Sequence, residues 1–348
     1  MSADVAETIV IETAALRVSL IPSRGADIFE LVDRESGQDT LFKTPWGVSG
    51  GLARTGGAAP VTSWFDSYAG GWTVLVPNGG AACEVMGVEL PFHGEASVAP
   101  WEVTARSDDG RSVDLRCLLR RSPLRLDRRV TLDRERPTLT LHERLTNIGG
   151  EPYDFIWAHH PTLGEALLDG QCRIDTSARS IETDASYDPP GNALVPGARG
   201  HWPLIEGREG TVDLSTVPAP GTTRSLLAYL SEFGSDAWYA VSNHGRGIGF
   251  ALRWPVDVFP CAWFWQELNA SSGYPFFRAA RAIAIEPSTT FPADGLAAAI
   301  ASSRARTLAP GEAAEVTLTA ALFRPRGAVT GVLSDGTVVF ADAAQQTT

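Results

Sequence analysis

Long apolar segments are absent from this sequence of 348 residues. No run approaches the roughly 20 apolar residues that a helix needs to cross a bilayer. The N-terminal residues 1–7 also lack the basic stretch and apolar core of a secretory signal peptide. We therefore expect a cytoplasmic protein that does not act at a membrane.

Cysteine is scarce, and its spacing carries no metal or disulfide signature. The cysteines are scattered along the chain, and no two form a Cys-x-x-Cys pair. This spacing argues against both a zinc knuckle and a dense disulfide framework. We expect free, buried thiols at the four positions, which are Cys83, Cys117, Cys172 and Cys261.

Positive charge is also in deficit. The chain carries 29 Lys and Arg against 41 Asp and Glu, which gives a formal net charge of -12. Such a protein is repelled by the phosphates of nucleic acid, so we expect no nucleic-acid partner. A neutral or cationic small molecule fits better. Few basic residues lie near the motifs described below, which disfavours a phosphorylated substrate.

Helical periodicity is scarce, and alternation with a period of two takes its place. Leu16, Val18 and Leu20 alternate with polar residues, which predicts a half-buried strand. The same alternation recurs over 113–119 and in the segments that follow it. The 34 glycines and 23 prolines cluster between such runs, where turns need them. Only residues 296–303 are a candidate for a helical turn or two.

The predicted fold class is therefore all-β. Many short strands indicate a large, twisted sandwich of antiparallel sheets with few short helices. A composition of 44% hydrophobic and 20% charged residues can bury a substantial core. The length lies within the range of one large β domain, which we place at residues 1–340. We expect residues 341–348 to form a frayed tail.

The most informative polar motif is the pair His159-His160, followed by Pro161. Neighbouring residues of a strand point to opposite faces, so only one of these two rings can face a given pocket. Pro161 ends the pairing there, which places the motif at a strand end, where functional residues often lie. The alternative is a histidine that is only hydrogen-bonded within the sheet.

Two further motifs could carry chemistry. His93 precedes a glycine that would let a ligand approach the backbone closely. Glu286 ends an alternating strand and is followed by Pro287. A carboxylate in that position is either a solvated strand end or a general base. Neither motif decides the question alone.

Several tryptophans lie close in sequence to these polar residues. An indole ring can pack on the C–H face of a sugar, although tryptophans also fill the core of a sandwich. We expect core filling for at least half of the ten in the chain. Trp265, which is adjacent to Gln266 and close to Glu267, is the preferred candidate for contact with a sugar. The tryptophans near the polar motifs are Trp72, Trp157, Trp254, Trp263 and Trp265.

Four stretches, taken in their order along the chain, resemble the aldose 1-epimerase (galactose mutarotase-like) family. They are 70–79, which contains Asn78, then 92–95, then 145–149 leading into 157–161, and finally 283–287. The resemblance implies a β-supersandwich with an open cleft on one sheet. It also implies a sugar substrate, no cofactor and no metal.

The resemblance assigns roles to individual residues. It implies that Glu286 removes the proton of the anomeric hydroxyl while His160 protonates the ring oxygen, so that the ring opens and closes to the other anomer. A carboxylate and an imidazole have ordinary pKa values of about 4.3 and about 6.5, which suit a base and an acid near neutrality. No clear match to the family's sugar-binding arginine or aspartate is found. The expected sugar contacts are His93, Asn78, Trp265, Glu267, His159 and Trp72.

Two other functions remain open from the sequence. The fold also serves as a non-catalytic sugar-binding module, and a fold alone does not fix function. A metal-dependent isomerase, lyase or hydrolase could use His93, His159 or His160 together with Glu267 and Glu286 as ligands. No short His-x-His or His-x-x-x-His spacing supports that second alternative. The sequence leaves both a monomer and a homodimer open.

Overall fold

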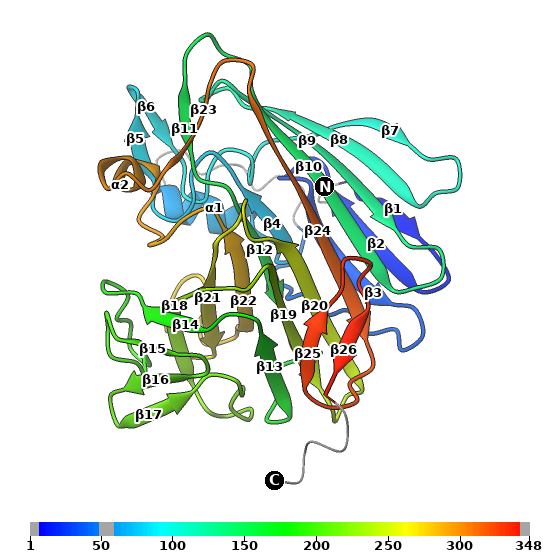
Figure 1. Ribbon diagram of the computed structural model, residues 1–348, viewed down its shortest axis with the longest axis vertical. Helices are drawn as coiled ribbons and strands as arrows, with labels where there is room; N and C mark the ends of the chain where they lie inside the picture. The colour runs from blue at the N-terminus through cyan, green and yellow to red at the C-terminus, as the bar shows by residue number, and fades with distance from the viewer. Residues whose placement is uncertain (1–6, 49–58, 342–348) are drawn as a thin grey trace.

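Two large antiparallel sheets face each other in the computed structural model, which describes residues 7–48 and 59–341 (Figure 1). The predicted all-β class is confirmed. The larger sheet has 12 strands. In order across the sheet they are β1 (Ile9–Glu12), β2 (Leu16–Ile21), β3 (Asp27–Asp33), β4 (Trp72–Leu75), β12 (Ala158–Leu163), β22 (Arg281–Ser288), β21 (Cys261–Leu268), β18 (Arg224–Ser231), β14 (Ser180–Thr183), β15 (Arg199–His201), β16 (Leu204–Gly207) and β17 (Gly210–Asp213).

The second sheet has eight strands and lies against the first. Its strands are β13 (Cys172–Thr176), β19 (Asp236–Asn243), β20 (Ile248–Pro255), β24 (Ala313–Phe323), β10 (Thr138–Asn147), β9 (Leu124–Leu132), β8 (Ser112–Leu118) and β7 (Glu102–Arg106).

Short elements complete the described part of the chain. Three two-stranded ribbons are formed by β5 (Cys83–Val85) with β6 (Val88–Leu90), β11 (Tyr153–Phe155) with β23 (Arg306–Leu308), and β25 (Val329–Val332) with β26 (Val338–Phe340). The helices are α1 (Pro60–Ser67) and α2 (Leu296–Ala301), and the second confirms the helical turn expected near residue 296. No helix in residues 7–48 and 59–341 has the length and apolarity to span a membrane. The tail expected to fray lies outside the described residues from 342 onward.

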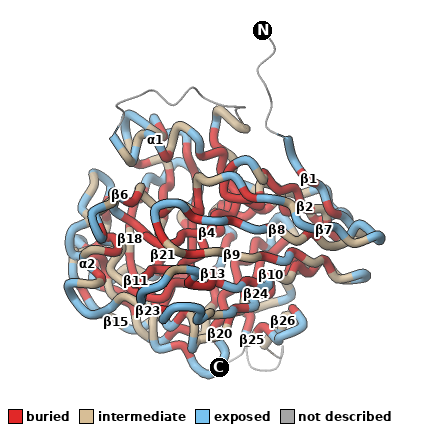
Figure 2. The backbone as a smooth tube through the Cα atoms, turned by 90° about the horizontal axis from the view of Figure 1, so that it is seen from above, coloured by how far each residue is buried: buried red, intermediate tan, exposed pale blue. Residues whose placement is uncertain are grey.

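The main hydrophobic core lies between the two sheets (Figure 2). Leu16, Val18 and Leu20 are fully buried, as their alternation predicts. Residues of β8 alternate between buried and exposed in the same way. Burying one leucine side chain contributes about 1.5–3 kcal/mol, so the many that meet between the sheets hold the sandwich together. The free thiols of Cys117, Cys172 and Cys261 are buried as expected, while Cys83 is half-buried.

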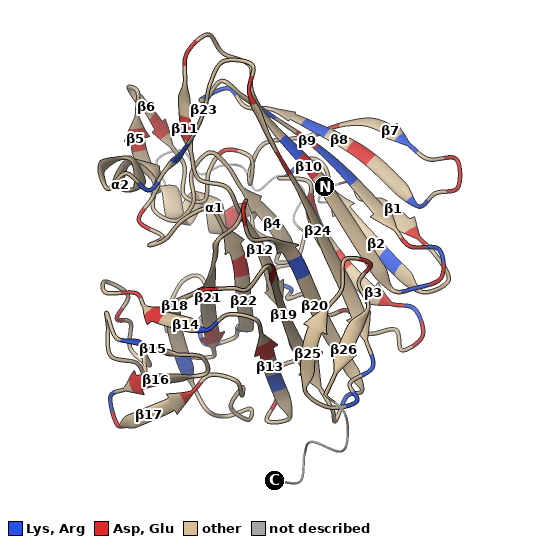
Figure 3. Ribbon diagram, in the orientation of Figure 1, with Lys and Arg blue, Asp and Glu red and all other residues tan. Residues whose placement is uncertain are grey.

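Charged residues occupy the outer face of the eight-stranded sheet. Blue and red segments lie side by side on β8, β9 and β10 in Figure 3. They include exposed or half-exposed ion pairs such as Arg129–Asp114 and Arg144–Glu315. Exposed pairs of this kind contribute about 0–1 kcal/mol each. Their main effect is to keep this face of the sandwich solvated.

Candidate active site

His160 and Glu286 lie together on the outer face of the 12-stranded sheet. They come from the adjacent antiparallel strands β12 and β22. Ala284 of β22 is paired with Thr162 of β12, so His160 and Glu286 point to the same side of the sheet. The distance between Nε2 of His160 and Oε1 of Glu286 is 3.5 Å. Two residues that are 126 positions apart in sequence thus form one acid–base pair.

Burial shifts the proton affinities of this pair in opposite directions. Burial raises the pKa of Glu286 well above its ordinary value. Burial, together with the positive charge of Arg24, lowers the pKa of His160 to about 4. Oε2 of Glu286 is buried and has no hydrogen-bond partner among the described residues. Burial therefore favours the neutral forms of both groups, and one carboxyl oxygen of Glu286 has no protein partner in the described residues.

A hydroxyl relay supports the other nitrogen of His160. Nδ1 of His160 lies 2.8 Å from the Thr162 hydroxyl, which lies 2.8 Å from the hydroxyl of Tyr68, just after α1. A threonine hydroxyl can accept from a protonated Nδ1 or donate to a bare one. This neighbour therefore tolerates both tautomers of the His160 ring.

His93 approaches His160 from the loop after β6. The centroids of the two rings are 5.6 Å apart. The backbone N–H of Gly80 donates to Nδ1 of His93 at 3.2 Å. Burial and the neighbouring His160 keep the pKa of His93 low, so its ring is neutral at neutral pH. Because Nδ1 accepts a hydrogen bond, the neutral ring carries its proton on Nε2, which is then a donor.

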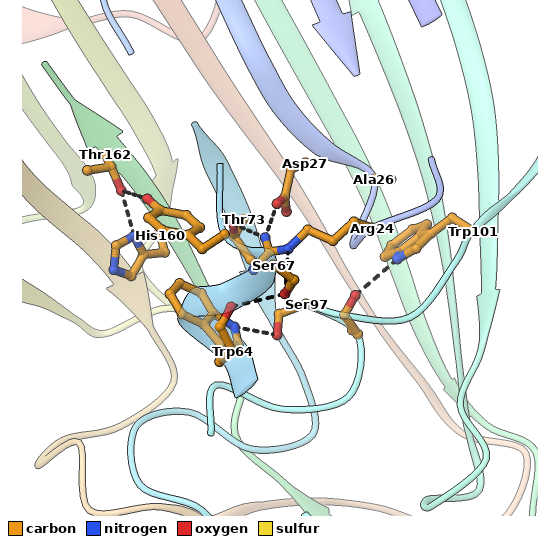
Figure 4. A network of polar contacts seen from close by, with 12 residues as sticks. Arg24, Ala26, Asp27, Trp64, Ser67, Thr73, Ser97, Trp101, His160 and Thr162 are labelled. Atoms are coloured by element: carbon orange, nitrogen blue, oxygen red, sulfur yellow. Dashed lines mark hydrogen bonds and ion pairs between the residues drawn. The ribbon is translucent and has the colours of Figure 1, made fainter. Parts of the chain in front are cut away.

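Arg24 is a site residue that the sequence analysis missed (Figure 4). It lies in the turn between β2 and β3, where its Nη1 donates to Asp27 and, at 3.4 Å, to the hydroxyl of Thr73. Its guanidinium lies over the rings of Trp64 and Tyr68, at 5.0 and 5.3 Å from their centroids. Nη2 is buried and has no hydrogen-bond partner in the described residues. The sequence signal that could have identified Arg24 is its position with Asp27 on either side of Gly25-Ala26, in a turn between two apolar strands.

Trp265, the residue expected to contact a sugar, lies beside the acid–base pair. It lies on the same face of β21 as the residue that pairs with Glu286. Its ring centroid is 6.3 Å from that of His160 and 5.9 Å from that of Phe276. The ring is partly exposed. The residue paired with Trp265 on β22 is Ala284, whose small side chain occupies little space beside the indole.

Two expected sugar contacts are instead engaged by the protein itself. The carboxylate of Glu267 accepts hydrogen bonds from the backbone of residues 270 and 271 and from the Ser271 hydroxyl. The Asn78 amide donates to the carbonyls of Ala81 and Pro91. Its oxygen accepts from the backbone N–H that begins α2. Both side chains hold loops around the site in place.

His159 and Trp72 lie between the sheets, on the opposite side of the 12-stranded sheet from His160. Both are almost fully buried, and the Trp72 indole N–H donates to Nδ1 of His159 at 3.2 Å. Nε2 of His159 lies 3.2 Å from Oε2 of Glu143 on β10. Adjacent strand residues face opposite ways, which corrects the expectation that both rings of the His159-His160 pair and Trp72 contact the sugar.

The fold does not bring together all of the residues that the sequence offered as metal ligands. His159 faces the interior, and Glu267 is bound to its own loop. In residues 7–48 and 59–341, no three His, Cys, Asp or Glu side chains are arranged to hold a metal ion.

Similarity to known proteins is evident in structure and not in sequence. No protein-family model matches the chain, and no curated protein sequence matches it. The Slr1438 protein of Synechocystis sp. PCC 6803 superimposes with a TM-score of 0.66 at 17% identity, over 93% of this chain and 98% of that one.

Two further solved structures carry names that describe a fold or an activity. A candidate aldose 1-epimerase of Escherichia coli K12 gives a TM-score of 0.63 at 15% identity, over 92% of this chain and 99% of that one. A galactose mutarotase-like protein of Lactobacillus casei gives 0.61 at 17% identity, over 91% and 100%. The resemblance found in the sequence is thus confirmed at the level of structure, and the chain has the galactose mutarotase-like fold.

Proposed function

We propose that the chain is an aldose 1-epimerase, a mutarotase that interconverts the α and β anomers of a hexose-like sugar. The observation that carries this proposal is the His160–Glu286 pair. It offers one shared proton and one unpartnered carboxyl oxygen on the outer face of the sheet, beside the partly exposed ring of Trp265. Mutarotation requires one group that accepts a proton and one that donates a proton, and nothing else.

The reaction proceeds by ring opening. Glu286 accepts the proton of the anomeric O1 hydroxyl while His160 donates a proton to the ring oxygen O5. The C1–O5 bond breaks, its electron pair goes to O5, and C1–O1 becomes the carbonyl of the free aldehyde. Rotation about C1–C2 presents the other face of the carbonyl, and the reverse transfers close the ring. Each group ends the cycle in the state in which it began.

The electrostatics suit a proton that moves back and forth within the pair. Burial favours the neutral forms of both groups, since it raises the pKa of Glu286 and lowers that of His160 to about 4. The arrangement with the proton on Glu286 and a neutral His160 is therefore the more stable one, and transfer of that proton to His160 produces the carboxylate and the imidazolium that ring opening uses. The singly protonated pair persists from about pH 4 up to the raised pKa of Glu286, and we expect the exchange rate to fall on both sides of that interval.

Arg24 and His93 supply the donors for charge that develops on the sugar oxygens. Nη2 of Arg24 is a buried donor without a partner in the described residues, and Nε2 of His93 carries the proton of a neutral ring. Preorganised donors of this kind typically contribute about 10²–10³-fold to a rate. The partly exposed indole of Trp265 offers a surface for the C–H face of the ring.

A neutral sugar fits this set of side chains better than an anionic one. The charge of Arg24 is opposed by Asp27, with which it forms an ion pair. Among the described residues, no Lys or Arg forms an ion pair with Glu286. The ring-opening donors are thus not accompanied by a surplus of positive charge that would favour a phosphate or sulfonate.

Exchange spectroscopy at the anomeric protons tests the proposal. The purified protein is mixed with a panel of aldoses, uronic acids and sulfonated sugars, and the α-to-β exchange rate is compared with the rate in buffer. We expect acceleration for at least one neutral aldose. Binding of sugars without acceleration for any of them would replace the enzyme by a sugar-binding module. Acceleration that disappears on chelation and returns with a divalent ion would favour metal-dependent chemistry.

A further inference from the structure

A buried ion pair lies between the two sheets, behind the strand that carries His160. Arg128 on β9 donates through Nε to Glu143 on β10, and the two side chains are 2% and 0% exposed. Withdrawing two charges from water is costly, and apolar side chains of similar volume often stabilise a core at least as well. The pair therefore has to be explained by something other than the cohesion of the sheets.

One arm of this pair reaches the neighbour of His160. Glu143 holds Nε2 of His159 at 3.2 Å, and the Trp72 indole donates to Nδ1 on the other side of the ring. An indole N–H only donates, so Nδ1 is the acceptor, and Nε2 faces Oε2 of Glu143 at a distance typical of an ion pair without forming a hydrogen bond. His159 is thereby fixed from both ends, and its orientation sets that of the next residue, His160.

The backbone ladder does not fix His160 against Glu286. Strands β12 and β22 pair at Ala158 with Ser288 and resume at Thr162 with Ala284, and no pair is formed between these points. The prolines that follow His160 and Glu286 have no N–H to donate to a ladder. His160 and Glu286 keep their backbone register with β4 and β21 on their other sides, so side chains supplement the ladder only across this direct gap.

The second arm reaches the turn that carries Arg24. Nη1 of Arg128 donates to the carbonyl of Ala26 at 3.0 Å. Ala26 has a φ of 46°, a left-handed conformation that a non-glycine residue adopts at a cost and keeps only when its surroundings impose it. The Arg128 guanidinium is itself held over the ring of Trp101, 4.7 Å from its centroid. Figure 4 shows Trp101 and Ala26 beside Arg24 and Asp27.

We propose that Arg128 and Glu143 are positioning residues that set the distance between Arg24 and His160. This ion pair contacts His159, the residue next to His160, through Glu143 and the turn that contains Arg24 through Arg128. Both contacts connect the 12-stranded sheet to the eight-stranded sheet. Neither residue touches the sugar; they act through His159 and Ala26. This inference rests on the proposed mutarotase function, because its effect is read in anomer exchange.

The test replaces both charges at once, in the double variant Arg128→Met/Glu143→Leu. Removing both partners leaves no uncompensated buried charge, although the Ala26 carbonyl loses its donor, so we expect a folded protein with a melting temperature near that of the wild type. The exchange kcat should fall, by about 10²-fold for a displacement of 1 Å, while KM changes far less. The matched control is Arg144→Met/Glu315→Leu, which removes a half-exposed pair between β10 and β24 and should leave kcat unchanged.

A wild-type kcat in the folded double variant overturns the proposal and leaves the buried pair a structural role. If the double variant does not fold, Arg128→Lys takes its place. Lysine keeps the positive charge beside Glu143 but lacks the branched guanidinium whose second nitrogen also donates to the Ala26 carbonyl. A lower kcat with wild-type stability supports positioning, and a wild-type kcat contradicts it.

A second readout separates this inference from the proposed function. The ¹⁵N shifts of the His160 imidazole and their pH titration are measured in the wild type and in the double variant. If the wild type accelerates no exchange, the mutarotase proposal fails, and these shifts still decide the positioning question. Altered His160 shifts in the double variant support it, and shifts that coincide with the wild type exclude it.

Discussion

Two histidine–glutamate pairs lie back to back on β12, and they differ in almost every electrostatic respect. His160 faces Glu286 on the outer side of the sheet, and His159 faces Glu143 on the inner side. The nitrogen–oxygen distances are similar, 3.5 and 3.2 Å. Burial raises the pKa of Glu286, whereas the charges of Arg128 and the hydrogen bonds around it hold that of Glu143 at about 2 despite burial.

The difference shows that burial alone does not decide what a carboxylate does. Both glutamates are almost completely withdrawn from water. Glu143 has a guanidinium against it and stays ionised, so it acts as a fixed anchor. Glu286 has no Lys or Arg partner in the described residues, so burial raises its pKa and favours the protonated form. A missing counter-charge is the feature that makes the outer pair suitable for proton transfer.

The largest expected effect follows from removing the outer carboxylate. Glu286→Gln keeps the shape and a carbonyl acceptor but cannot take a proton, so exchange should slow by about 10²–10⁴-fold. Sugar affinity, measured by calorimetry, should change little. Exchange at the wild-type rate in this variant would mean that another group is the base, and the two histidine–glutamate pairs would then not differ in catalytic role.

The adjacent histidines should respond in different observables. His160→Ala removes the proton donor and should lower kcat by about 10²–10⁴-fold with little loss of stability. His159→Ala leaves the buried indole N–H of Trp72 without its acceptor and should lower the free energy of unfolding by about 1–3 kcal/mol. Exchange NMR and urea unfolding measure the two effects. Large and equal losses of kcat in both folded variants would place both rings at the substrate.

Stability should also separate the two glutamates. Glu143→Leu leaves the Arg128 charge buried without its partner, which typically costs about 3–5 kcal/mol of unfolding free energy. Glu286→Leu removes a buried carboxyl that has no counter-charge, so it should be neutral or stabilising. Urea midpoints of the two variants give the comparison directly. A destabilised Glu286→Leu would mean that the outer carboxyl is paired in the folded state.

The smallest effect is a pH dependence of opposite sign for the two carboxyls. The pKa of Glu143 is lowered to about 2 in the folded state, so its contribution to stability is complete above the ordinary value of 4.5 and is lost as the pH falls through 2. The raised pKa of Glu286 makes its contribution complete below 4.5 and lost as the pH rises. Unfolding at a series of pH values, with the two leucine variants as controls, separates the contributions. Parallel curves for both variants would contradict the assignment.

The sequence carried the sheet pattern well because alternation is a local property. The inward face of Leu16, Val18 and Leu20 can be read from three residues, and so can the opposite facing of His159 and His160. The strand order of the sheets follows from contacts between distant segments, which periodicity does not reveal; the family resemblance supplied the sandwich architecture and no strand order.

The site was only partly predictable for the same reason. His160, Glu286, His93 and Trp265 were found because each stands in a recognisable local motif. Arg24 was missed because its role depends on rings that lie some 40 residues further along the chain. Glu267 and Asn78 looked like ligand contacts because a sequence does not show which side chains are already satisfied by backbone groups, as both of these are.

The backbone of His93 implies that this position is occupied for its side chain and not for its conformation. His93 has a φ of 60°, and the following Gly94 has a φ of 80° with two backbone oxygens within 2.6 Å of where a Cβ would lie. Glycine at position 93 would adopt this conformation without the cost of about 1–2 kcal/mol that a side chain incurs. His93→Gly would remove that cost, but it would also remove the ring that accepts the Gly80 N–H and packs against Trp64, so the strained backbone is the consequence of keeping this side chain in place.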